Sequence, residues 1–223
     1  MCSYSNEGLR CKKVRQMPVD GDPLIGLFFE VTPHQGHLKH YFSYVEKLQP
    51  ELAKHSGLVS LNRYQTLSDD CSILSYQLWK NEKSIEKWRN NKMHRLAQKA
   101  GIKVHFKDYR IRVGERVSFW PQGKTSKLDN GSIAKSSSLL LCVQSEAPIS
   151  QDLFAKLGFF ESVYCELSDS NQFVTLIRPN DLFCAKTIAS TIISDLTCKI
   201  DLFAINRDYS MVKTIWHHKT LMR

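Results

Sequence analysis

Five side chains near the middle of the sequence have types and spacings suited to binding and deprotonating an organic molecule. They are Trp88, Arg89, Asn91, His94 and Gln98. At about 100° per residue along a helix, Trp88, Asn91 and Gln98 share one stripe beside the apolar face. An imidazole can act as a general base near neutral pH, and a guanidinium or an amide can hold the resulting anion. The segment predicts a pocket, with His94 and Arg89 as catalytic candidates.

The same residues also fit a structural role, and the sequence leaves both interpretations open. The apolar stripe of the predicted helix consists of Ile85, Met93, Leu96 and Ala100. In the structural interpretation, Trp88 covers the edge of this stripe, the Arg89 stem lies along it, and His94 is solvated. In the pocket interpretation, the helix must turn His94 inward, and Arg89 needs an anionic partner because an isolated buried cation is costly.

The elements around these residues follow the order β-α-β-β-α-β, which is that of a ferredoxin-like unit. Their apolar periodicities are interrupted by turn and stop signals at Thr32-Pro33 and Gly101. We expect strands at 24–31, 58–67, 72–80 and 103–113, and helices at 35–55 and 83–100. The predicted pocket then lies between the second helix and the sheet.

The second half of the chain repeats this order of elements. Strands are expected at 139–144, 161–167, 172–177 and 199–205, with helices at 151–157 and 181–193. A repeated order indicates a duplicated unit. We therefore predict four parts: a polar arm at 1–22, a first unit at 23–117, a linker rich in Gly, Pro and Ser at 118–138, and a second, degenerate unit at 139–216.

The positive charge of the chain is concentrated around the predicted pocket. The 223 residues carry a formal net charge of +9, and residues 80–116 alone hold 12 basic and 4 acidic side chains, a net of +8. No aromatic stacking platform or helix-turn-helix pattern accompanies these cations, so a nucleic-acid partner is disfavoured. A solvated helix face or a site for an anionic small molecule explains them better.

The remaining composition favours a cytoplasmic protein without a membrane partner, a metal or a nucleotide. No apolar run approaches the ~20 residues of a membrane span, and no secretory leader follows Met1. The seven cysteines lack paired spacing, which indicates reduced thiols and no zinc site. His34, His37 and His40 are spaced for one helix, but no carboxylate accompanies them. Nucleotide and flavin motifs are also missing.

A set of short motifs in the first unit gives the chain a family resemblance. They are Phe29-Glu30-Val31-Thr32-Pro33, Tyr41, Gly57-Leu58, Arg63-Tyr64, Leu74-Ser75, Trp79, Trp88-Arg89, His94-Arg95, Ala97-Gln98 and Phe106-x-Asp108-Tyr109-Arg110. In this order and spacing, residues 24–117 resemble the antibiotic biosynthesis monooxygenase (ABM) domain family. The resemblance implies an α+β fold in which two ferredoxin-like units form a dimeric α+β barrel. A chain with two such units would form this barrel within itself, with possible further pairing into a homodimer left open.

The resemblance implies several activities. Some members are cofactor-free oxygenases of aromatic phenols or act on quinols, which gives Trp88, Phe28 and Tyr64 as walls of an aromatic slot. A related branch degrades haem with a first-strand Asn and with a Trp and a His ten residues apart. Here Gln98 follows Trp88 at that distance, and Phe28 occupies the Asn position.

We therefore expect a monooxygenase acting on a small aromatic or quinone-type compound, without a bound organic cofactor or metal. The expected catalytic residues are His94 and Arg89, and the expected substrate-binding residues are Trp88, Asn91, Gln98, Phe28 and Tyr64. The alternative is a non-catalytic barrel protein, or one that binds or degrades haem. The partner in either case is an aromatic or anionic hydrophobic small molecule.

Overall fold

The computed structural model describes residues 24–67, 72–121, 127–128, 138–157 and 162–211. The predicted arm at 1–22 and the tip of the predicted hairpin at 68–70 lie outside these residues. The elements are β1 (Ile25–Pro33), α1 (Leu38–Ala53), β2 (Leu58–Thr66), β3 (Ile73–Trp79), α2 (Glu82–Arg89), α3 (Lys92–Ala100), the π-helix η2 (Gly101–His105), β4 (Phe106–Trp120), β5 (Lys127–Leu128), β6 (Ser138–Ser145), α4 (Gln151–Leu157), β7 (Ser162–Glu166), β8 (Phe173–Ile177), α5 (Leu182–Asp195) and β9 (Cys198–Ser210).

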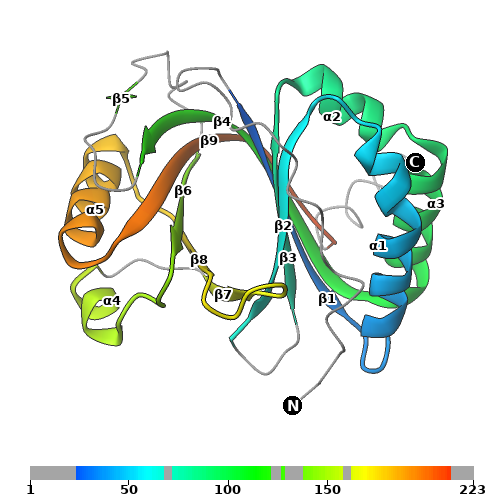
Figure 1. Cartoon of the computed structure of the whole chain (residues 1–223), viewed down its shortest axis with the longest axis horizontal. Coiled ribbons are helices and arrows are strands. Elements are labelled where there is room, and N and C mark those ends of the chain that lie inside the picture. Colours follow the sequence, from blue (N-terminus) through cyan, green and yellow to red (C-terminus); the bar gives the residue numbers. More distant parts are fainter. Residues whose placement is uncertain (1–23, 68–71, 122–126, 129–137, 158–161, 212–223) are drawn as a thin grey trace, which may run out of the picture.

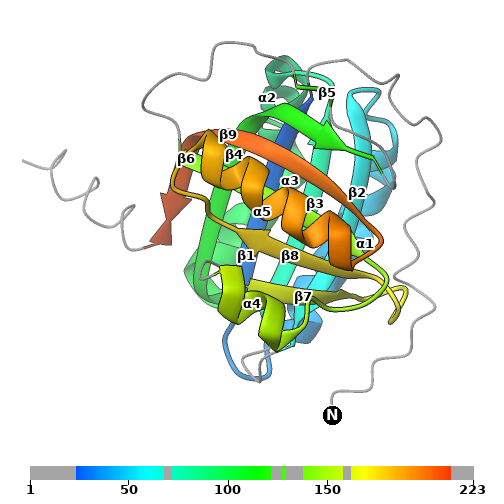
Figure 2. The same cartoon turned by 90° about the vertical axis from the view of Figure 1, so that its left-hand side faces the viewer.

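The strands form one sheet that closes on itself. Its order is β1-β3-β2-β7-β8-β6-β9-β4, and β4 pairs back with β1. Within this ring, β4-β1-β3-β2 and β9-β6-β8-β7 are the two ferredoxin-like units. Figure 1 shows α1, α2 and α3 outside the first unit, and Figure 2 shows α4 and α5 across the outside of the second. The predicted α+β fold, with two such units forming a barrel within one chain, is confirmed.

Alternation along the strands separates an inner core from two outer cores. On β1, Phe28 packs inside the barrel with Tyr76 and Phe203, while Phe29 packs beneath the helices. The outer core of the second unit is a continuous cluster between its strands and α4 and α5. None of the described helices is long and apolar enough to cross a membrane.

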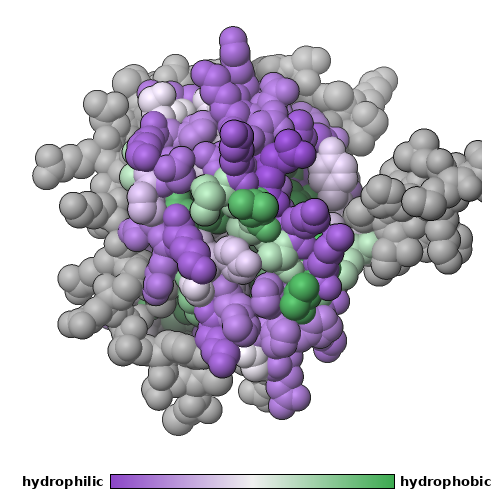
Figure 3. Space-filling view, turned by 90° about the vertical axis from the view of Figure 1, so that its right-hand side faces the viewer, coloured by the Kyte–Doolittle hydropathy of each residue, from purple (hydrophilic) through white to green (hydrophobic). Residues whose placement is uncertain are grey.

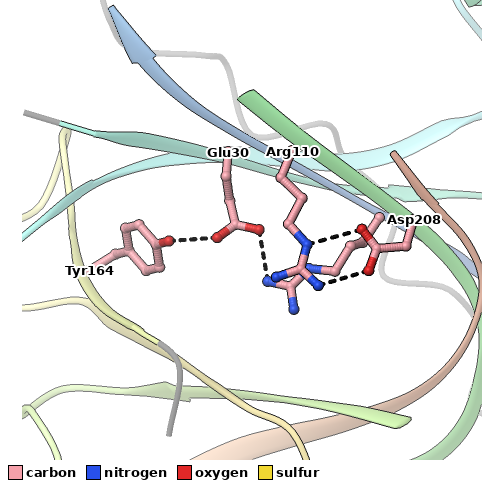
Figure 4. A network of polar contacts seen from close by, with 5 residues as sticks. Glu30, Arg110, Tyr164 and Asp208 are labelled. Carbon is pink, nitrogen blue, oxygen red and sulfur yellow. Dashed lines mark hydrogen bonds and ion pairs between the residues drawn. The ribbon is translucent and has the colours of Figure 1, made fainter. Parts of the chain in front are cut away.

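One ion pair and one hydrogen bond inside the barrel connect the two units, as Figure 4 shows. Arg110 on β4 donates from Nε and Nη2 to the two carboxylate oxygens of Asp208 on β9, at 2.9 and 2.7 Å. Glu30 on β1 accepts from Arg112 Nη2 at 2.7 Å and from the Tyr164 hydroxyl of β7 at 2.9 Å. The Arg112 side chain is only 2% exposed, and its pairing with Glu30 avoids the cost of an isolated buried ion.

Two β-bulges lie where β4 and β9, the last strands of the two units, pair with each other. They direct side chains at the end of each strand toward the helical layer of the other unit. The pairing of β4 with β9 shifts between Arg116 and Ser118 and again between Val113 and Gly114, where Asn206 is the extra residue of β9. An extra residue reverses which face the following side chains occupy. Beyond the bulges, Trp120 packs in the outer core of the second unit.

The predicted second helix at 83–100 was wrong, because two helices occupy this segment. The break lies at Asn90 and Asn91, and the Asn91 side chain caps α3 by accepting a hydrogen bond from the His94 backbone N–H. The assignment of helix faces at 100° per residue therefore does not hold across this break. Met93 and Leu96, predicted to be core residues, are 45% and 60% exposed.

The expected strand at 103–113 also differs from the structure. The helical region continues as η2 to His105, so β4 begins at Phe106. β4 then runs to Trp120, into the segment predicted as a linker, and β5 pairs with it there. The pairing of β4 with β9 continues to Trp120 and explains the greater length of β4. The sequence did not predict this extension because the segment after residue 117 has no local strand signal.

Candidate active site

A cavity of about 350 Å³ lies between the sheet of the first unit and its helices. Its walls include Leu27, Phe29, Tyr41, Tyr44, Val45, Leu48, Gln77, Ile85, Trp88, Arg89, His94, Ala97, Gln98, Ile102, His105, Phe106, Tyr109, Ile111, Val113, Arg207 and Tyr209. The size is that of a small organic ligand, and apolar walls with a few polar groups are typical of such sites. No Asp or Glu lies among these lining residues.

His94 is the best-placed base among the residues that line the cavity. Its ring stacks on the Trp88 indole, with centroids 4.3 Å apart and planes 16° apart. His94 Nδ1 lies 3.0 Å from the Trp88 backbone carbonyl. A carbonyl oxygen only accepts, so Nδ1 carries the hydrogen and Nε2 holds the lone pair of the neutral ring. Burial lowers the pKa of His94, partly opposed by the Trp88 hydrogen bond, so the neutral form prevails at pH 7.

Side-chain contacts hold two parts of the cavity wall in place, the Trp88 ring and the Gln77 amide. Trp88 is buried, and His55 contacts it edge-on, with ring centroids 5.8 Å apart. Gln77 accepts from Trp79 Nε1 at 3.0 Å and donates to Ser75 Oγ at 3.2 Å. These contacts hold the Gln77 amide in the cavity wall, so the wall is formed before any ligand arrives.

Two guanidinium groups line the cavity from different units. Arg89 lies at the end of α2, while Arg207 comes from β9 of the second unit together with Tyr209. Arg207 Nη2 lies 2.6 Å from both carboxylate oxygens of Glu82. Because of the bulge at Asn206, Arg207 and Tyr209 line this cavity, while Asp208 meets Arg110 inside the barrel.

The structure brings four of the seven predicted site residues to the cavity: Trp88, Arg89, His94 and Gln98. Asn91 does not line it, because its side chain caps α3 and donates to Glu51 Oε2 at 3.3 Å. Phe28 and Tyr64 are not walls of this cavity either. Both are buried inside the barrel, on the opposite face of the sheet. Leu27 and Phe29 supply the β1 wall instead, since alternation exchanges the faces of neighbouring residues.

Sequence reasoning missed the contribution of the second unit. Asn206-Arg207-Asp208-Tyr209 echoes Phe106-Lys107-Asp108-Tyr109 in the first unit, and both segments reach the cavity wall. This repeated Asp-Tyr segment was the one sequence signal that the second unit contributes to the cavity. The face taken by Arg207 depends on a bulge, which the sequence pattern does not reveal.

The histidines at the start of α1 form a separate group at the cavity edge. The rings of His37 and His40 contact His105, with centroids 5.3 and 4.8 Å apart, and His37 Nδ1 lies 3.1 Å from His105 Nδ1. Within the described part of the chain, no group of three or more His, Cys, Asp or Glu is arranged to hold a metal ion.

Comparison with known proteins finds a family match within the first unit. Residues 24–100 match the family model described as antibiotic biosynthesis monooxygenase. The matched segment lies within the residues 24–117 whose motifs resemble that family.

One relative is the protein named jasmonate monooxygenase ABM of Pyricularia oryzae. It is 35% identical over 92 residues, which cover 41% of this chain and 43% of that protein. The matched segment is thus less than half of the relative's length.

Solved structures extend the likeness of the fold to both units. An aldoxime dehydratase in complex with butyraldoxime aligns with a TM-score of 0.54 at 8% identity, over 92% of this chain and 92% of that chain. A second aldoxime dehydratase structure aligns with a TM-score of 0.51 at 8% identity, over 82% of this chain and 81% of that chain. At such identities the likeness concerns the fold alone.

Proposed function

We propose that the protein is an ABM-type monooxygenase that oxidises a small aromatic or quinone-type compound in the cavity of the first unit, without a bound organic cofactor. The observation that carries the proposal is His94, a half-buried, neutral imidazole on the wall of a largely apolar cavity whose described lining residues include no Asp or Glu. The ABM domain and the name of the related monooxygenase support the reaction class.

The proposed reaction begins with proton transfer from the substrate to His94 Nε2. The resulting electron-rich anion reduces O2, and a C–O bond forms at a ring carbon to give a peroxide. Loss of water from this peroxide leaves a carbonyl group. The substrate thus loses two hydrogens and gains one oxygen, and the other oxygen leaves as water, so no external reductant is needed.

The other cavity residues hold the anion in place. Trp88 supplies a flat apolar wall, and Arg89, Gln98 and Arg207 supply donors for the negative oxygen. Donors fixed in a low-dielectric cavity stabilise developing charge more than water does. Jasmonate, named for the relative, belongs among the test substrates because it is an apolar carboxylate that the same cations could hold.

Oxygen consumption tests this proposal with an anthrone, a naphthoquinol and jasmonate as substrates. We expect saturable O2 uptake with at least one of them, and a loss of about a hundredfold to ten-thousandfold in kcat for His94→Gln. His34→Gln, at an exposed position before α1, is the matched control and should keep full activity. Equal rates in His94→Gln and the unchanged protein would refute the role of His94.

Haem binding is a second candidate, favoured by the position of His94. Its Nε2 would bind the iron, and Arg89 and Arg207 would pair with the propionates, so the donor types of these residues fit the group. Bound haem would supply oxygen-activating iron. A saturable Soret shift on titration with haem, lost in His94→Gln, would support this candidate over the cofactor-free reaction.

A further inference from the structure

An apolar groove lies on the outer surface of the first unit, on the far side of its helices from the sheet. It has a volume of about 470 Å³ and is lined by Tyr44, Lys47, Leu48, Met93, Leu96, Lys99, Ala100, Lys103 and Val104. Large apolar side chains project from it and beside it. Leu96 is 60% exposed, Val104 53% and Ile102 43%. Figure 3 shows apolar residues at the centre of this face, surrounded by hydrophilic ones.

The break between α2 and α3 creates this surface. Because α3 restarts at Asn91, its apolar residues no longer continue the buried face of α2. Leu96, Ala100 and Val104 follow one another at four-residue spacing along α3 and η2, and all three line the groove. A contiguous exposed apolar stripe on a folded protein marks an interaction surface more often than chance.

The charged side chains on the stripe's own segment and on the groove walls are all positive, and Glu51 near the start of α3 is paired with Lys54 and Asn91. Residues 92–107 contain Lys92, Arg95, Lys99, Lys103 and Lys107, and no Asp or Glu. Lys47 on α1 lies on the opposite wall of the groove. A stripe of apolar side chains with lysines on both sides is the pattern of a helix that lies in the interface of an anionic bilayer.

We propose that this face docks onto an anionic lipid surface. Leu96 and Val104 enter the boundary between headgroups and acyl chains, and Lys99 and Lys103 meet the lipid phosphates. The chain's own ends are poorer occupants. Residues 212–223 carry Lys213, Lys219 and Arg223 without any acidic residue, and residues 1–23 hold 4 basic and 3 acidic side chains. The proposal revises the expectation, drawn from the sequence, of no membrane partner.

The docking face also lies next to the proposed active site. Tyr44 and Leu48 line both the groove and the cavity, so one layer of side chains separates them. Docking would hold the cavity against a bilayer in which an apolar substrate accumulates. The docking proposal itself rests on the surface and not on the proposed reaction, so either can fail without the other.

Co-sedimentation of the full chain with lipid vesicles tests the proposal. We expect binding to vesicles made of equal parts phosphatidylcholine and phosphatidylglycerol, weakened by salt, and little binding to phosphatidylcholine alone. Lys99→Gln/Lys103→Gln should weaken binding about thirtyfold, since each lysine near an anionic surface contributes about fivefold. Lys186→Gln/Lys199→Gln, which removes the same charge from the second unit, should bind like the unchanged protein.

A second pair of variants tests the apolar contribution. Leu96→Gln should weaken vesicle binding, while Phe183→Gln on α5, where the side chain is 80% exposed, should leave it unchanged. Circular dichroism checks that all variants fold. The proposal is overturned if the unchanged protein fails to sediment with the anionic vesicles at low salt. Equal losses in the control variants would overturn it as well, as would tighter binding to polyglutamate than to the vesicles, which would assign the face to an acidic protein.

Discussion

The two units of the barrel share one topology, yet only the helical layer of the first unit encloses the cavity described above. In the second unit, α5 buries Ala185, Ile188, Ala189 and Ile192 against the sheet, and Trp120 fills the space beside them. In the first unit, the shorter α2 and α3 leave that space open, and the strand end that arrives from the other unit brings Arg207 and Tyr209. The same crossing of strands thus completes a core on one side and a ligand cavity on the other.

This difference shows how a duplicated unit can divide its tasks. A close-packed layer contributes stability through burial, while an open layer gives up part of that burial to hold a ligand. Because both layers rest on one closed sheet, the filled half supports the open half. The comparison predicts opposite responses of the two layers to the same substitution.

Enlarging one alanine in each layer should give the largest contrast. Ala97→Phe places a ring in the cavity and should lower turnover about a hundredfold, because a misplaced substrate reacts poorly, while thermal stability stays nearly unchanged. Ala189→Phe forces the same ring into a filled core and should cost about 1–3 kcal/mol of unfolding free energy. Urea unfolding and O2 uptake measure both effects. Equal destabilisation by the two substitutions would contradict the comparison.

Removing the charge that the second unit lends to the cavity should have a smaller effect. Arg207→Gln should raise KM about tenfold for an anionic substrate with little change in kcat, since one charge-assisted hydrogen bond is lost. Glu82→Gln breaks the Arg207 ion pair but leaves the guanidinium, and serves as the matched control. Steady-state kinetics that give the same KM for Arg207→Gln and the unchanged protein would confine the site to the first unit.

The smallest expected effect is on the pH dependence of stability. Burial lowers the pKa of His94 in the folded state, so the unfolded chain binds this proton more readily. The stability contributed by the neutral ring is therefore present above about pH 6.5 and is lost as pH falls through the folded pKa. Urea unfolding from pH 8 to pH 5 should show a shallower decline in His94→Gln than in His34→Gln, an exposed control. Parallel curves would mean that His94 is not held neutral by burial.

The fold was largely predictable because its signals are local and repeated. The order β-α-β-β-α-β appears twice, and one such unit leaves a sheet edge that a second unit can cover. Four cavity residues were predicted because Trp88, Arg89, His94 and Gln98 fall on adjoining helical segments. The Asn91 cap interrupts the helix, and it also rotates His94 to the Trp88 carbonyl, which the angular count did not anticipate.

The remaining errors come from features that depend on distant parts of the chain. Simple alternation places Arg207 on the same face of β9 as Phe203 and Ile205, inside the barrel. The extra residue at Asn206 reverses that face, and it is defined only by pairing with β4. Phe28 was placed on the wrong face of β1 for a related reason, since alternation fixes two faces but does not say which one the helices cover.

The two units pair along two seams, β2 with β7 and β4 with β9. These seams differ in length, and we expect them to differ in how readily they open by thermal fluctuation. Among the described residues, the β2–β7 seam pairs Tyr64–Thr66 with Tyr164–Glu166 and adds backbone hydrogen bonds from Leu67 to Val163 and from Leu167 to Arg63. The β4–β9 seam is longer and extends from Arg110–Ser210 to Trp120–Ile200. A short seam opens at lower free energy than a long one. The barrel should therefore part first along β2 and β7 and swing about the long seam, which also carries the Arg207 wall of the cavity. The cavity would then lie beside the hinge, where the two units move least relative to each other.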